Sequence, residues 1–151
     1  MQMFWQEHID ILKKKYPQSD FRYPFTDWYT VLQSIQAKFI AKHDSNYHFT
    51  NWIDNIKNQS LIKTFPRHQI TAEINKLNPT TNYWLVIVGD APTSKMLIYD
   101  CKVSPINSLI SLANSHFFII DKKYKWLTYF QIDNEQISLI KSGNGETPFD
   151  K

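Results

Sequence analysis

The chain has 151 residues, a length that fits one domain, and its 17 Lys and Arg against 14 Asp and Glu give a formal net charge of +3. With 42% hydrophobic and 21% charged residues it has the balance of a folded globular protein, which excludes a disordered chain. A lone cysteine, the lack of a signal peptide and the lack of a long apolar run predict a soluble cytoplasmic protein without a membrane partner.

The N-terminal half has the periodicity of α-helices. Residues 2–15 place apolar side chains at helical spacing and end in three lysines, which suit the negative end of a helix dipole. A second helix is predicted from Thr26, its N-cap, to about Ala41, and a short third helix after Thr50. The segment 61–78 is ambiguous, because Ile70, Ile74 and Leu77 fit one helical face but lie between Pro66 and Pro79.

The C-terminal half has short apolar runs separated by turn residues. The run at 83–88, YWLVIV, predicts a central strand with both faces buried. Ser104 and Pro105 predict the N-cap and first position of one inserted helix. Five strands are predicted, at 83–88, 95–99, 116–120, 125–131 and 136–140. We therefore expect a single α+β domain, 1–151, with a helical N-terminal half packed on a largely antiparallel five-stranded sheet and a loosely ordered tail at 142–151.

Asp90, followed by Asp100 and Lys102, resembles the carboxylates and the D-x-K lysine of a large class of metal-dependent nucleases. That chemistry needs both carboxylates on one magnesium ion, with the lysine beside the attacking water. The predicted hairpin places Asp90 at its tip and Asp100 at its open end, about 20 Å apart. The hairpin therefore opposes a nuclease site, and a different pairing of these strands would revive it.

The histidines and the cysteine do not form a pattern of known chemistry. His43 and His48 are five residues apart, whereas a zinc-binding helix uses a spacing of four. His116 opens a strand, where we expect it to be partly buried with a backbone partner. Cys101 is expected to be an ordinary buried thiol, because no neighbouring base is evident. We expect no catalytic residue, no metal site and no cofactor.

The segment 121–130, DKKYKWLTYF, is rich in both lysine and aromatic residues. As a strand it points Trp126 and Phe130 to one face, and Leu127 and Tyr129 to the other. Either a helix of the protein or a binding partner covers that second face. Tyrosine, tryptophan and leucine with a rim of lysine are typical of protein interfaces. The candidate partner-binding residues are Tyr124, Lys125, Trp126, Leu127 and Tyr129, with Tyr124 and Trp126 also candidates for the core.

The C-terminal half also carries a family resemblance. It combines the YWLVIV strand, a second strand, a short helix near Ser104, the motif FFIIDKKYKWL, and Gly143 after the last strand. This order, with Trp84, Tyr124 and Trp126, resembles small uncharacterised bacterial families that include immunity proteins of toxin systems. The resemblance implies a non-enzymatic inhibitor that binds one cognate toxin in the cytoplasm of the producing cell.

A nucleic-acid-binding or regulatory protein is the main alternative. Lys122, Lys123 and Lys125 with their aromatic neighbours would then contact phosphates and bases. Arg22 and Arg67 are the only arginines, however, and arginine is the residue that most often reads bases and clamps phosphates. A hydrolase with dispersed catalytic residues is a third possibility. Salt dependence separates the first two, because binding to phosphates weakens steeply as salt rises.

Overall fold

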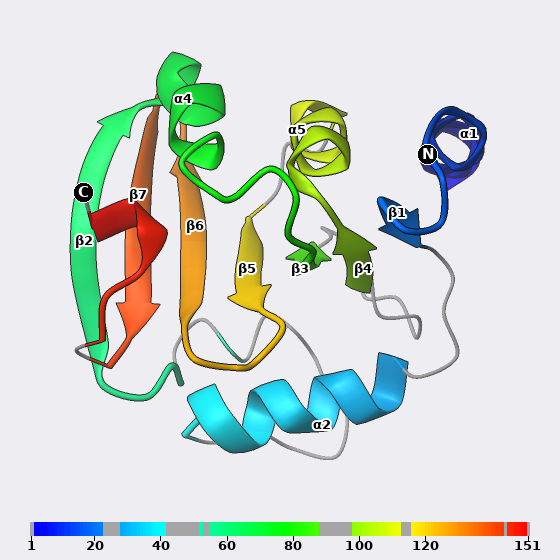
Figure 1. Ribbon diagram of the computed structural model, residues 1–151. Helices are drawn as coiled ribbons and strands as arrows, with labels where there is room; N and C mark the ends of the chain where they lie inside the picture. Colours follow the sequence, from blue (N-terminus) through cyan, green and yellow to red (C-terminus); the bar gives the residue numbers. More distant parts are fainter. Residues whose placement is uncertain are drawn as a thin grey trace.

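An antiparallel sheet with helices on both faces dominates the structure, a computed structural model (Figure 1). It describes residues 2–22, 28–41, 52, 55–87, 98–112, 116–143 and 145–150. The elements are α1 (Gln2–Lys15), β1 (Phe21–Arg22), α2 (Trp28–Phe39), β2 (Gln59–Pro66), η1 (Arg67–Gln69), α4 (Ile70–Ile74), β3 (Tyr83–Ile87), β4 (Ile98–Cys101), α5 (Val103–Leu112), β5 (Phe117–Asp121), β6 (Leu127–Asp133), β7 (Gln136–Ser142) and η2 (Pro148–Asp150). No helix in these ranges is both long and apolar enough to span a bilayer.

The described strands form one sheet of seven, in the order β1-β4-β3-β5-β6-β7-β2, and every neighbouring pair is antiparallel. The predicted α+β class is therefore confirmed, and β3 to β7 overlap the five predicted strands. β4 extends to Cys101 and β6 begins at Leu127 instead of 125, while residues 88 and 95–97 of the predicted strands lie outside the described residues. The predicted number of strands is wrong, because β1 and β2 join the sheet at its two edges. β2 occupies the first part of the ambiguous segment 61–78, so the N-terminal half is not purely helical.

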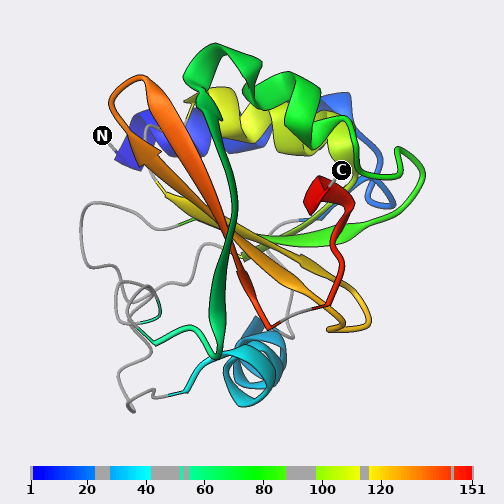
Figure 2. The same cartoon turned by 90° about the vertical axis from the view of Figure 1, so that its left-hand side faces the viewer.

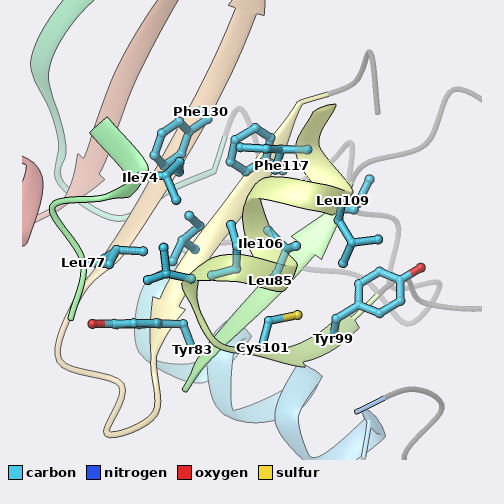
Figure 3. Packing of buried hydrophobic residues seen from close by; sticks show 14 of the residues in the cluster. Ile74, Leu77, Tyr83, Leu85, Tyr99, Cys101, Ile106, Leu109, Phe117 and Phe130 are labelled. Carbon is cyan, nitrogen blue, oxygen red and sulfur yellow. The ribbon is translucent and has the colours of Figure 1, made fainter. Parts of the chain in front are cut away.

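Helices divide between the two faces of the sheet, and each face has its own hydrophobic core (Figure 2). On one face, α1, α4 and α5 cover the first core, which contains Ile106 and Leu109 of α5, Ile74 of α4 and Leu85 of β3 (Figure 3). On the other face, α2 contributes Leu32 and Ile35 to the second core. The central strand is buried on both sides, as the YWLVIV run predicts.

The predicted helices differ from the observed ones mainly at their ends. α1 spans the predicted residues. α2 ends at Phe39, because the chain beyond it turns to form an isolated antiparallel bridge between Ile40 and Ile56. α5 begins at Val103, one residue before the predicted N-cap, where the Ile106 N–H donates to the Lys102 carbonyl. Thr26 and most of the predicted third helix lie outside the described residues. Within that segment Trp52 is buried, and Ile56 forms the antiparallel bridge with Ile40 in place of a helical turn.

The C-terminal segment packs onto the sheet instead of forming the loosely ordered tail expected at 142–151. Phe149 of η2 is 0% exposed, and its ring meets those of Trp126 and Phe130 edge-on at centroid distances of 5.9 and 5.2 Å. The Lys141 ammonium pairs with the Asp150 carboxylate at 2.8 Å. We call residues 145–150 the C-terminal hook. Although most residues of the hook are polar, one buried aromatic ring and one ion pair hold it to β6 and β7.

Candidate protein-binding site

The turn between β5 and β6, residues 122–126, is held by the side chain of Asp121. Asp121 Oδ1 accepts hydrogen bonds from the backbone N–H groups of Lys125 and Trp126, the latter at 3.0 Å. The Tyr124 N–H donates to the Asp121 carbonyl at 3.0 Å, and Tyr124 has a positive φ of 55°. Such a φ is uncommon for a non-glycine residue, and it persists here because the surrounding hydrogen bonds impose it. The segment, which we call the basic turn, therefore has one defined backbone shape.

Lys122 clamps the basic turn to the neighbouring strands. Its ammonium forms a 2.8 Å ion pair with Asp100 of β4 and lies 3.7 Å from the centroid of the Trp84 ring of β3. Asn82 donates a second hydrogen bond to the Asp100 carboxylate at 2.9 Å. Trp84 and Asp100 are direct cross-strand partners, so sheet register creates this arrangement. Because Lys122 combines an ion pair with a cation–π contact, its positive charge interacts mainly with groups of the protein itself and is less available to a partner.

Leu127 and Tyr129 are buried, so the prediction that they bind a partner from an exposed face is wrong. They are 0% and 1% exposed and belong to the core beneath α2. The Tyr129 ring stacks on Phe118 at a centroid distance of 4.8 Å. The predicted alternation itself is correct, since Phe130 belongs to the opposite core. The protein's own core, to which α2 contributes, covers the second face of β6.

The other three predicted residues lie at the surface to different extents. Lys125 is exposed, whereas Tyr124 and Trp126 are half-buried. Trp126 packs against the rings of Tyr83 and Phe149, each at a centroid distance of 5.9 Å, so its orientation is set by the first core and the C-terminal hook. Lys123 is exposed beside them; it was named for the nucleic-acid alternative but not among the candidate partner-binding residues. Lys123 belongs to the same DKKYKW motif. The candidate residues were chosen mainly from the strand that follows the turn, where side chains alternate between two faces, and this choice left out Lys123.

Asp100 and Lys102, the D-x-K residues of the nuclease hypothesis, belong to separate ion pairs. Asp100 is paired with Lys122, while Lys102 contacts the Asp20 carboxylate at 2.7 Å. β3 and β4 pair as the predicted antiparallel hairpin, with Asp100 opposite Trp84 at its open end. Asp90 lies outside the described residues. Among the residues that the structure describes, no group of three or more His, Cys, Asp or Glu side chains could hold a metal ion.

His116 and Cys101 have the surroundings expected from the sequence. His116 Nδ1 accepts a hydrogen bond from the Ile132 N–H at 3.1 Å, which confirms a partly buried histidine with a backbone partner. Cys101 is fully buried. Burial raises the pKa of the Cys101 thiol well above its ordinary value, and the nearby Asp100 carboxylate raises it further. A thiol in this environment does not form the thiolate that a nucleophile requires.

Comparison with known proteins gives one match. No curated protein and no solved structure matches the chain. A model described as a family of unknown function (DUF6756) matches residues 6–145, a span that contains all seven strands of the described sheet and the basic turn, and ends before η2. Because this match covers most of the sequence, the chain belongs to this family of unknown function, DUF6756.

Proposed function

We propose that the protein is a non-enzymatic inhibitor of the immunity type, which binds and neutralises a cognate bacterial toxin in the cytoplasm. The observation that carries the proposal is the basic turn, a backbone of defined shape that presents Lys123 and Lys125 to solvent. A surface that is already in its binding conformation loses less conformational entropy on association. The resemblance of the C-terminal half to immunity proteins supports the same conclusion.

The side chains of the basic turn suit a protein interface. Trp126 and Tyr124 are half-buried beside the exposed Lys123 and Lys125, with Trp126 packed against the first core and Tyr124 against the second. Aromatic anchors surrounded by a polar rim are the usual arrangement at the centre of a protein–protein contact. The contacts of Trp126 with Tyr83 and Phe149 keep its ring in place before a partner arrives.

The structure weakens the support for the nucleic-acid alternative. Single-stranded nucleic acids bind to aromatic faces that bases can stack upon, combined with a positively charged groove. In the hairpin, Tyr129 and Phe130 are buried, and Lys122 is paired with Asp100. Two exposed lysines and two half-buried rings remain for a nucleic acid to contact. This set is small for binding driven by phosphate contacts.

The proposed function is tested by co-expressing the protein in bacteria with the C-terminal domain of the protein that the gene immediately upstream encodes. The inhibitor should restore growth to cells in which that domain is toxic, and the two proteins should purify as one complex. Lys123→Glu with Lys125→Glu should abolish the rescue. As a matched control, Lys13→Glu with Lys14→Glu makes the same change in net charge on exposed residues of α1 and should preserve it. An upstream product that is harmless to cells would remove the main support for the proposal.

A further inference from the structure

Charge is distributed unevenly along β6. The basic turn precedes this strand, and the turn that follows it carries the exposed carboxylates of Asp133 and Glu135. β6 has seven residues, so about 20 Å separates the two turns. Figure 2 shows the two hairpin turns at opposite ends of the sheet. Arg67 adjoins Glu135 through a backbone hydrogen bond and offsets part of the negative charge. One end of β6 is therefore basic and the other is acidic.

Positive charge is in excess around the basic turn. Asp100 is matched by Lys122, while the Asp121 carboxylate, which accepts two backbone N–H groups, contributes one further negative charge. Lys123 and Lys125 remain exposed beside them. Arg22 is also exposed, and it stands directly opposite Asp100 on the edge strand β1. The basic turn and the adjoining edge of the sheet thus present three exposed cations next to one ion pair and the single carboxylate of Asp121.

These cations are suited to carboxylates on a folded partner. Lysine ammonium groups are compact point charges that pair with carboxylates without requiring a particular geometry. The Trp126 ring lies against Tyr83 and Phe149, so a base could not stack between them. We infer that the basic turn docks against a carboxylate-rich surface of the partner protein, with Lys123 and Lys125 as its contacts. This inference rests on the proposed function and specifies the chemistry of the partner.

The turn that carries Asp133 and Glu135, which we call the acidic turn, would orient the partner as it approaches. A carboxylate-rich surface is attracted to the basic turn and repelled by Asp133 and Glu135, so the two ends of β6 orient the partner before contact. Exposed charges separated by more than about 8 Å are largely screened at physiological salt. The orienting effect should therefore disappear as salt rises, whereas short-range contacts of Trp126 and Tyr124 should persist.

The inference is tested with the full-length protein and two fluorescent probes of equal net charge, an oligoglutamate peptide and an oligothymidylate. Binding is measured by anisotropy at low salt. The unaltered protein should prefer the peptide, and Lys123→Glu with Lys125→Glu should weaken peptide binding about fivefold or more. The control pair, Lys13→Glu with Lys14→Glu, should change it less than about twofold, because α1 lies far from the basic turn (Figure 1).

Three results would overturn the inference: equal loss in both double variants, preference for the oligothymidylate, or no peptide binding by the unaltered protein. Equal loss would mean that net charge alone governs binding. Preference for the oligothymidylate would assign the surface to nucleic acid. The growth rescue described above distinguishes this failure from failure of the proposed function. If cells are still rescued by the variant Lys123→Glu with Lys125→Glu, the protein is an inhibitor but binds its partner through another surface.

Discussion

Replacement of Phe149 by alanine is the most direct test of the C-terminal hook. The Phe149 ring is 0% exposed and lies edge-on to Trp126 and Phe130. Its backbone N–H is bonded to Thr147 Oγ1 at 3.1 Å, which fixes the direction from which the ring enters the core. Phe149→Ala removes the ring but leaves the Lys141–Asp150 ion pair in place. The substitution thus isolates the apolar part of the attachment.

Removal of a buried phenylalanine ring typically costs about 3–5 kcal/mol of folding free energy. The two edge-on ring contacts favour the upper part of that range, because aromatic pairs add to the energy of area burial. A domain of this size is stable by about 5–15 kcal/mol in total, so the loss is a large fraction. At about 2–4 °C per kcal/mol, the melting temperature should fall by about 6–20 °C.

Urea denaturation followed by circular dichroism and tryptophan fluorescence measures this loss. The midpoint should fall while the slope stays constant, which indicates reduced stability without a change in the unfolded state. Leu61→Ala is the control, because Leu61 is 64% exposed on the edge strand and its truncation should cost about 0.5 kcal/mol or less. A loss below about 1 kcal/mol for Phe149→Ala would refute the packing of the hook and restore the loosely ordered tail.

Further predictions concern the ion pair of the hook, the second core and the end of β7. Desolvation raises the pKa of Asp150, but hydrogen bonds from Lys141 and Thr147 more than offset this, so the folded-state pKa lies below the ordinary value. The stability that this carboxylate contributes is present above the unfolded-state pKa of about 3.9 and is lost as pH falls through the folded-state value. Asp150→Asn should therefore make the free energy of unfolding, measured by urea denaturation at several pH values, depend less steeply on pH in the acid range. Tyr129→Ala should cost about 3–5 kcal/mol in denaturant melts, and an unchanged melting temperature would contradict its burial. A Cβ at Gly143 or Gly145 would meet no neighbouring atom within 4 Å, but only Gly143 has a φ in the left-handed region, +80°. Gly143→Ala should therefore cost about 1 kcal/mol by calorimetry, whereas Gly145→Ala should be nearly neutral.

The strands that were predicted from the sequence share a local signal. The run at 83–88 and those that became β5, β6 and β7 are apolar or alternating segments bounded by turn residues, and these patterns depend only on neighbours in the chain. β1 has two residues, too few to show any period. β2 is interrupted by a bulge between Leu61 and Lys63 and ends at Pro66, which an edge strand tolerates. Its alternation is broken at the bulge, and the segment was therefore ambiguous.

The candidate site was predicted in part. The motif DKKYKW located the basic turn, but Lys125 and Trp126 were predicted to begin the following strand. The turn extends through Trp126, and β6 begins only at Leu127. The ion pair between Lys122 and Asp100 could not be predicted, because it joins residues from different hairpins through the register of β3 and β4. Because this ion pair was not predicted, Lys122 was counted among the residues that could contact phosphates.

Periodicity and turn chemistry in the amino-acid order were sufficient for the α+β class, the five strands of the C-terminal half and the division of β6 into two faces. These properties follow from each residue and its near neighbours. The order of residues could not say what covers Leu127 and Tyr129, since both a helix and a partner fit an apolar face. The core to which α2 contributes covers them, and Phe149 anchors the polar end of the chain. Burial of this kind depends on contacts between segments far apart in the chain, which arise only when the sheet and its helices assemble.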